Sequence, residues 1–342
     1  MPNRISFWLK IILVLISLYA LSQVYPIYLP VVLAMVFSFL LNPLVNFLCG
    51  IRVRGRYSLP RGAAVFCSFL LVGMVLLVVA FFALAPLLAE FNSFARDFPG
   101  LLKRVQLAAV SLNESFIGLP DNIRATITQS FSEAAIYLGG IITRFLSGVL
   151  NFAATALELI ATPVLTYYFL KDWRKMKEDF LKLLPLKLRL KTKAVLKEMG
   201  LVVSNYIRGQ IIISLIMGGM VFSGLYFLGV DYPLILALVA ALTETIPILG
   251  PVIGAVPAII LAYLASPFLA LKVLVFYLII HQIENTIIMP AVMGKTINLH
   301  PAAIILSLLA GGHFFGIIGM MAAVPAAAIL KILLKHLWRY ES

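Results

Sequence analysis

Charged residues are scarce in this sequence. Asp, Glu, Lys and Arg make up 12% of its 342 residues, whereas they make up about 25% of a soluble globular domain. Apolar residues reach 62%, and the mean hydropathy is +1.05. This composition excludes an ordinary soluble globule and indicates an integral membrane protein. The length allows about six to eight membrane segments and no separate large catalytic domain.

Cysteine and histidine are equally rare, with two Cys and four His in the whole chain. Cys49 and Cys67 lie at the expected cytoplasmic ends of neighbouring spans, where we expect no structural disulfide. The histidines are scattered and lack the spacing of a zinc site. The sequence therefore predicts neither a metal site nor a cofactor.

Catalytic motifs are missing as well. The sequence contains no His-Glu-x-x-His, no Gly-x-Ser-x-Gly and no Walker phosphate loop. These motifs are the signatures of zinc hydrolases, serine hydrolases and phosphate-binding NTPases. We therefore expect that the protein is not an enzyme.

What the sequence does contain is long apolar runs. Six of them are long enough to cross a hydrocarbon core of about 30 Å as helices. They are residues 7–25, 28–48, 63–86, 145–170, 206–228 and 268–289.

Basic residues are concentrated between some of these runs. Ten of the 27 Lys and Arg fall in residues 171–197, and four fall in residues 52–61. With both termini in the cytoplasm, these segments are cytoplasmic, as the positive-inside rule requires. The net charge of +13 therefore orients the protein, and we expect no binding of nucleic acid. Apolar residues within 171–197 favour an interfacial helix beside anionic membrane lipid.

Two further apolar stretches, residues 234–265 and 302–330, are broken before they can cross. Glu244-Thr-Ile-Pro-Ile-Leu-Gly-Pro251 interrupts the first, and Gly311-Gly-His-Phe-Phe-Gly316 interrupts the second. The arms of the first stretch, of 12 and 14 residues, reach about 18 to 21 Å against about 30 Å of hydrocarbon. We predict that each stretch turns back inside the membrane, from opposite faces. The end of the second stretch, from residue 314, could instead form a full span.

The predicted fold class is all-α: a polytopic integral membrane protein with six full spans and two re-entrant helical hairpins, or about eight hydrophobic segments. The two hairpins give the C-terminal half an inverted repeat. Along the chain we expect an N-terminal scaffold of three spans (1–86), an extracytoplasmic amphipathic helical region (87–144), the fourth span (145–170), a basic cytoplasmic amphipathic segment (171–204) and a transport core with the two Pro/Gly-broken hairpins (205–342).

Glu244 and Glu284 are acids that this topology places at membrane depth. An ionisable group there costs about 2.5 to 3.5 kcal/mol, and its default interpretation is functional. Glu244 stands between Thr243 and Thr245 at the first break, so this segment could bind a cation, a proton or a polar cargo. Alternatively, the Glu244 carboxylate only satisfies unwound backbone.

Glu284 belongs to the segment His281-Gln-Ile-Glu-Asn285. Helical spacing places His281, Glu284 and Asn285 on one face, with Gln282 beside it. This group could bind polyhydroxylated or cationic ligands and relay protons, or it could join helices by hydrogen bonds. Gln210, inside the cytoplasmic mouth of the fifth span, completes the candidate substrate- and ion-binding set.

Glycines and prolines around the breaks are candidates for gating or hinge motion, because small residues permit close backbone approach. Packing of helices in lipid explains many of them equally well. The candidate gating residues are Pro247, Gly250, Pro251, Gly254, Pro290, Gly294, His300, Pro301, Gly311, Gly312, Gly316 and Gly319.

Several of these motifs together resemble a known family. Asn205-Tyr-Ile-Arg-Gly-Gln210, Ile246-Pro-Ile-Leu-Gly-Pro-Val-Ile-Gly254 and Pro290-Ala-Val-Met-Gly294 look like those of the autoinducer-2 exporter family of bacterial and archaeal permeases. The resemblance implies a polytopic transporter without a nucleotide-binding domain, in a bacterial or archaeal plasma (inner) membrane. Members of this family have been linked to export of the furanone-type signal autoinducer-2, and some relatives to exchange of sodium or lithium for protons.

Secondary transport is therefore our first hypothesis. The protein would be an exporter or permease that moves a small polar metabolite or signal, coupled to an ion or proton gradient, with the cargo held between the two hairpins. A monovalent cation/proton antiporter, a passive channel and a non-transporting membrane scaffold are the alternatives. The expected partners are membrane lipid and a small-molecule or ion cargo. A homo-oligomer is also open, because the first four spans are rich in apolar surface.

Overall fold

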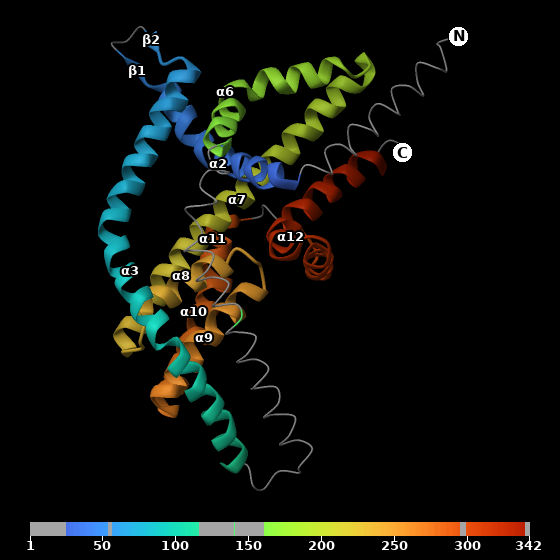
Figure 1. Cartoon of the computed structure of the whole chain (residues 1–342). Helices are drawn as coiled ribbons and strands as arrows, with labels where there is room; N and C mark the ends of the chain where they lie inside the picture. The colour runs from blue at the N-terminus through green and yellow to red at the C-terminus, as the bar shows by residue number, and fades with distance from the viewer. Residues whose placement is uncertain (1–24, 54–56, 116–139, 141–160, 295–298, 339–342) are drawn as a thin grey trace. The chain divides into compact units, whose positions relative to one another are not determined.

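The computed structural model describes residues 25–53, 57–115, 140, 161–294 and 299–338. Most of the first predicted span, large parts of the predicted extracytoplasmic region and fourth span, and both chain ends lie outside the described residues. The chain divides into two compact units: Met1–Gly73 with Asn151–Leu183, and Met74–Leu150 with Leu184–Ser342. Figure 1 shows the elements of each unit along the chain.

The described part of the chain is almost entirely helical, as predicted. The only strands in the described residues form a small antiparallel pair, β1 (Arg52–Val53) and β2 (Tyr57–Ser58), in the loop between the second and third predicted spans. Five of the described helices are long and apolar enough to cross a membrane. They contain the segments Pro30–Gly50, Arg61–Val105, Leu188–Leu228, Pro267–Met293 and Pro301–His336.

In the first unit, α2 (Tyr25–Gly50) packs along α6 (Ala161–Lys182). The Thr166 hydroxyl of α6 is buried and donates to the Thr162 carbonyl of its own helix at 2.7 Å. Such a bond satisfies the hydroxyl where helices approach closely in an apolar setting. Arg61, at the start of α3 (Arg61–Ser115), donates from Nε to the Leu170 carbonyl in the middle of α6 at 2.6 Å. This hydrogen bond joins the start of α3 to α6.

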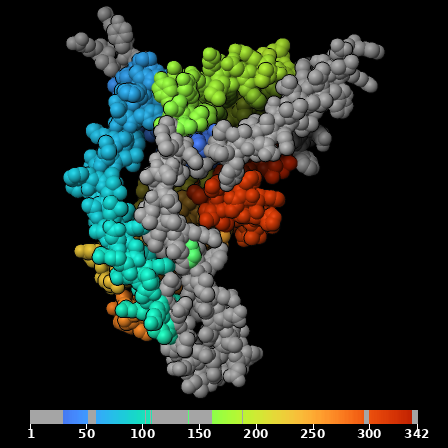
Figure 2. All heavy atoms as spheres, viewed as in Figure 1, coloured from blue at the N-terminus to red at the C-terminus, as the bar shows by residue number. Residues whose placement is uncertain are grey.

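The surface of α3 is strongly apolar. Phe81, Phe82 and Leu77 are each more than 70% exposed, and α3 lies on the visible surface of Figure 2, in turquoise. An exposed apolar face of this length is stable in contact with lipid or with another apolar surface. It therefore supports membrane insertion, and the homo-oligomer stays a prediction.

The second unit is built around α7 (Leu186–Leu228), a continuous helix of 43 residues. It contains the C-terminal part of the predicted basic segment as well as the predicted fifth span. It ends at Gly229, whose φ of 73° allows its N–H to bond back to the Leu225 and Tyr226 carbonyls. Glycine adopts this left-handed conformation at little cost, so it terminates helices well.

Two short apolar helices follow, α8 (Pro233–Thr243) and α9 (Leu249–Ala265). They have 11 and 17 residues and therefore rise about 16 and 26 Å. A Cβ atom on Gly250 would overlap the Thr243 carbonyl oxygen, and one on Gly254 would lie 3.0 Å from the Ala240 Cα. The two arms thus pack backbone to backbone, in the manner of a tight hairpin.

The start of this hairpin is attached to the distal part of α3 within the same unit. The Tyr232 hydroxyl donates to Asp97 Oδ2 at 2.6 Å, and the Ile235 N–H donates to Glu90 Oε2 at 2.8 Å. The second bond gives the first turn of α8 a carboxylate acceptor for a free backbone N–H. Burial, reinforced by the hydrogen bond to Asp97, raises the pKa of Tyr232 to about 12.

The predicted sixth span corresponds to α10 (Pro267–Ile283), a single π-helical turn η1 (Glu284–Ile288) and α11 (Met289–Met293). Ser266 caps the start of α10 by accepting a hydrogen bond from the Leu269 N–H at 3.0 Å. The π turn adds one residue to a helical turn and locally rotates the face that follows it. It begins at a buried acid, Glu284.

The last element, α12 (Pro301–Trp338), consists of two arms joined by a kink at Gly316, which has φ 60° and ψ −142°. Cβ atoms on Gly311 or Gly319 would overlap the carbonyl of the other glycine. The chain therefore turns sharply within the second predicted break. Neither the depth of these hairpins in a bilayer nor the inverted repeat follows from this geometry, so both stay predictions.

Candidate functional site

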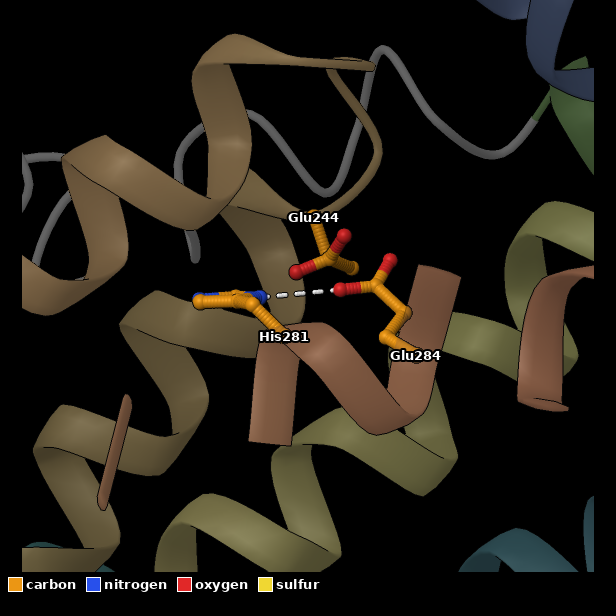
Figure 3. A group of neighbouring side chains, drawn as sticks. All are labelled: Glu244, His281 and Glu284. Atoms are coloured by element: carbon orange, nitrogen blue, oxygen red, sulfur yellow. Dashed lines mark hydrogen bonds and ion pairs between the residues drawn. The ribbon is translucent and has the colours of Figure 1, made fainter. Parts of the chain in front are cut away.

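The second unit contains a compact group of ionisable side chains. Glu244, His281 and Glu284 each place one potential ligand atom within 4.8 Å of the other two. His281 Nδ1 lies 2.9 Å from Glu284 Oε2, and the Glu244 carboxylate points toward both (Figure 3). Glu244 and Glu284 are 4% and 6% exposed, and they are the only buried charged residues in the described part of the chain. We call these three residues the Glu–His–Glu cluster.

Glu244 owes its position to the end of α8. Its N–H still bonds to the Ala240 carbonyl at 2.9 Å, but the helix stops here. Its own carbonyl therefore has no helical partner and instead accepts a 2.6 Å hydrogen bond from Gln210 Nε2 of α7. Because an unpaired carbonyl in an apolar interior is costly, this bond stabilises the break. Gln210 therefore contacts the backbone of Glu244 and not its carboxyl group.

His281 and Glu284 are positioned by the junction of α10 and the π turn. The two residues are three apart, so their side chains lie on the same side of the helix. The His281 ring lies 5.9 Å from the Tyr277 ring, measured between centroids. Its other nitrogen, Nε2, is buried and has no hydrogen-bond partner among the described residues.

The electrostatics of the cluster are unusual for a protein interior. One carboxyl oxygen of Glu244 and one of Glu284 lie within 4.8 Å of each other. No Lys or Arg in the described ranges forms an ion pair with either of them; their one basic neighbour is His281. Two full negative charges within 4.8 Å repel by at least about 3 kcal/mol at an effective dielectric constant of about 20. A cation among the three side chains would offset this repulsion.

Other residues predicted for the binding site are bonded elsewhere or exposed. The Thr243 hydroxyl donates to the Val239 carbonyl at 2.9 Å, and the Thr245 hydroxyl donates to the Leu242 carbonyl at 2.6 Å. Asn285 is exposed, and so is Gln282, which donates to the Thr286 hydroxyl at 3.2 Å. None of these four residues belongs to the Glu–His–Glu cluster.

The candidate gating residues occupy the ends and bends of helices. Gly294 ends α11 with φ 54°, and Gly316 bends α12 with φ 60°. Ile248, between α8 and α9, has φ 70°, an uncommon value that costs a β-branched residue about 1 to 3 kcal/mol. Pro247 and Pro251 lie at the first break, Pro290 lies in the first turn of α11, and Pro301 begins α12. His300 Nδ1 accepts a hydrogen bond from the Ala302 N–H at 3.2 Å. Gly312 packs beside Met320.

Sequence reasoning missed two polar residues on the same helix as Gln210. Tyr206 and Ser214 are 4% and 7% exposed, and neither hydroxyl has a hydrogen-bond partner among the described residues. Residues four apart lie on one helical face, so Tyr206, Gln210 and Ser214 form a polar stripe on α7. The regular spacing of these polar residues in an apolar span is the signal that could have revealed it.

Comparison with known proteins gives a consistent result. Residues 9–339 match a family described as "AI-2E family transporter". The chain is 30% identical to YrrI of Bacillus subtilis (strain 168), whose name describes a transport protein, over 100% of this chain and 98% of the relative. It is 28% identical to YueF of the same organism, also named as a transport protein, over 97% and 93% of the two chains. It is 25% identical to PerM of Escherichia coli (strain K12), named as a permease, over 77% and 75%.

Proposed function

Because this chain belongs to the AI-2E family of transporters, we propose that it is a secondary transporter whose coupling proton or ion binds at the Glu–His–Glu cluster. It moves a small polar metabolite or signal across the membrane. One observation carries the proposal: two buried carboxyl groups and an imidazole meet at the broken end of a short helix. An ionisable group in a membrane segment is expensive and marks ion or proton pathways.

The cluster can couple ion binding to a conformational change. Without a proton or cation between them, the Glu244 and Glu284 carboxylates repel each other. A bound proton or cation is attracted by both carboxylates and holds them together. Glu244 is joined to α7 through Gln210, while Glu284 is part of the π turn after α10. A change in the separation of the two acids therefore moves the end of α8 relative to both helices. Ile248 and Gly250 lie next to this end and are the closest hinge candidates.

The polar stripe of α7 is the proposed contact surface for cargo. Gln210 already bonds to the backbone of Glu244, and Tyr206 and Ser214 lie one helical turn away on either side of it. Buried hydroxyl groups without a protein partner can bond to hydroxyl or carbonyl groups of a ligand. A small polyhydroxylated molecule of the autoinducer-2 type fits these donors and acceptors.

The proposed topology follows the same argument. The α8–α9 hairpin and the two arms of α12 would enter the membrane from opposite faces as re-entrant hairpins, related as an inverted repeat, beside six full spans. Their support is the short reach of α8 and the close glycine contacts in both bends. With the positive-inside pattern, both termini are cytoplasmic, and the membrane is a bacterial or archaeal plasma membrane.

The test uses purified protein in liposomes that contain a pH-sensitive dye. Autoinducer-2 is the test cargo, and an imposed pH gradient is the driving force. We expect gradient-dependent uptake in the wild type and a loss of its pH dependence in Glu244→Gln. Glu178→Gln, an exposed acid of α6, is the matched control and should behave as wild type. Unchanged pH dependence in a folded Glu244→Gln protein would contradict the coupling role.

A monovalent cation/proton antiporter is the second candidate, because all three side chains of the cluster are ionisable. The same liposomes separate the two candidates when sodium or lithium replaces autoinducer-2. Proton movement that follows an added sodium or lithium gradient favours the antiporter. Cargo flux that does not depend on any imposed ion gradient would instead indicate a passive channel.

A further inference from the structure

The donor set of the Glu–His–Glu cluster is that of a particular class of cation. Two carboxylates and one imidazole converge within 4.8 Å. Imidazole nitrogen is a ligand for Mn²⁺, Fe²⁺, Co²⁺, Ni²⁺ and Zn²⁺, whereas Na⁺, Mg²⁺ and Ca²⁺ prefer oxygen ligands alone. We propose that Glu244, His281 and Glu284 bind a divalent transition-metal ion.

The charge of the cluster fits such an ion. Two carboxylates and a neutral imidazole carry two negative charges, which one divalent cation neutralises. No Lys or Arg in the described part of the chain pairs with either acid. Four other carboxylates differ, because each of them is paired with a basic side chain or accepts a hydrogen bond. Glu198 pairs with Lys335 and His336, and Asp179 pairs with Lys182. Glu90 accepts from the Ile235 N–H, and Asp97 accepts from the Tyr232 hydroxyl.

The geometry needs little adjustment. Ligand atoms on one metal ion lie about 2.0 to 2.2 Å from it, so two of them are at most about 4.4 Å apart. The three side-chain atoms are within 4.8 Å of one another, and His281 Nδ1 is 2.9 Å from Glu284 Oε2. Movements of a few tenths of an ångström, within the reach of flexible Glu side chains, bring them to metal-ligand distances. Further coordination positions are left for water or cargo.

A second observation supports a ligand at this place. The Glu244 side chain is 4% exposed and points into the cluster (Figure 3), yet its carboxyl oxygens accept no hydrogen bond from an N–H or O–H group in the described part of the chain. Buried carboxylates normally accept hydrogen bonds from N–H or O–H donors. When the His281 proton is on Nε2, Nδ1 presents a lone pair to the two acids. All three groups then offer electron pairs to the same point.

A metal ion at the Glu–His–Glu cluster would occupy the place that the proposed function gives to the coupling ion. A part of the metal ion in transport therefore rests on the proposed function, while metal binding itself can be measured without transport.

The experiment uses the purified full-length protein in detergent, dialysed against Mn²⁺, with free Mn²⁺ measured by electron paramagnetic resonance. We expect saturable binding of one ion per chain, displaced by Zn²⁺ and unaffected by an approximately hundredfold excess of Na⁺. These arms need only the wild-type protein, so they do not depend on the folding of a variant.

Variants locate the site. Glu244→Gln and Glu284→Gln should each lower the Mn²⁺ affinity at least about tenfold, while Glu178→Gln leaves it unchanged. Absence of saturable binding, displacement by Na⁺, or unchanged affinity in both variants would overturn the metal site. If binding fails while pH-coupled flux depends on Glu244, the proposed function stands and the metal inference is wrong. If Mn²⁺ binds as expected but flux ignores the gradients, the site stands and the coupled function is wrong.

Discussion

The two broken segments of the second unit share a backbone geometry and differ in chemistry. Gly250 packs against the end of α8, and Gly311 packs against Gly319 across the bend of α12. The first break carries Glu244, which is 4% exposed, whereas Phe314 at the second bend is 73% exposed. Tight reversal of the chain is therefore common to both segments, but the buried ionisable group belongs to the first alone.

This difference separates two requirements of a transporter. A sharp bend in apolar surroundings needs glycine, because any side chain would prevent the backbones from meeting. Ion coupling needs in addition a partner helix that supplies polar groups, which α7 and the π turn do at the first break. We therefore expect changes at α12 to affect stability or gating, and changes at the α8–α9 hairpin to affect ion binding as well.

The largest effect on stability should come from filling the glycine contacts. Gly250→Ala and Gly319→Ala each place a Cβ atom into a carbonyl group, which should lower the free energy of unfolding by about 1 to 3 kcal/mol. Only Gly250→Ala should also weaken Mn²⁺ binding, because its Cβ would lie 2.9 Å from the Glu244 Cα. Unfolding in mixed micelles and Mn²⁺ dialysis measure the two effects.

The control for this comparison is Gly219→Ala in α7, where no atom lies within 4 Å of the added Cβ. Alanine should be neutral or stabilise the helix there by up to about 1 kcal/mol. Equal loss of Mn²⁺ affinity in Gly250→Ala and Gly319→Ala would contradict the prediction that only the first break takes part in metal binding.

A smaller effect is expected from Gln210→Ala. The change removes the donor from the buried Glu244 carbonyl and should cost about 1 to 2 kcal/mol of unfolding free energy. Because Glu244 then loses its attachment to α7, Mn²⁺ affinity should fall as well. Gln282→Ala, an exposed glutamine, is the matched control and should change neither quantity. Wild-type stability in Gln210→Ala would show that this hydrogen bond does not maintain the break.

Tyr232→Phe tests the outer attachment of the first hairpin, which α12 does not share. Loss of the hydrogen bond to Asp97 should cost about 0.5 to 1.5 kcal/mol at neutral pH. Burial first, and then Asp97, raises the pKa of Tyr232 to about 12, above an ordinary value of about 10. The stabilisation by the neutral phenol is therefore complete below pH 10 and is lost as the pH rises from about 10 to 12.

Thermal unfolding of wild type and Tyr232→Phe at pH 8 to 12 measures this dependence. The two midpoints should differ at pH 8 and converge toward pH 12, while Tyr226→Phe, whose residue is 65% exposed, follows the wild type. A constant difference across this pH range would mean that ionisation of Tyr232 is not the cause.

The smallest effect is expected for Thr245→Val. Its hydroxyl bonds to the Leu242 carbonyl of the preceding turn and is not part of the Glu–His–Glu cluster, so stability should change by no more than about 0.5 kcal/mol. Mn²⁺ binding should be unchanged. A clear loss of binding would place Thr245 in the site after all and contradict the geometry described above.

Both breaks and both acids stand out in the sequence against an apolar background. Glu244 and Glu284 are conspicuous charges in segments of high hydropathy, and Gly316 lies at the end of the second interruption. The structure interrupts or bends the helices in both segments and buries both acids, while their role in binding stays a prediction. The exposure of Asn285 and the bond from the Thr245 hydroxyl to the Leu242 carbonyl depend on the packing of the folded chain, which helical spacing does not encode.

The amino-acid sequence by itself determined that this chain is a multi-pass helical membrane protein, because hydrocarbon requires long apolar runs with internally bonded backbone. It also determined where those runs must break, since only glycine and proline interrupt them so abruptly. Only the tertiary structure decided that Glu244 meets His281 and Glu284, which lie 37 and 40 positions further along the chain. That meeting depends on the packing of α8 and α10 against α7, and no local pattern encodes the contacts between helices.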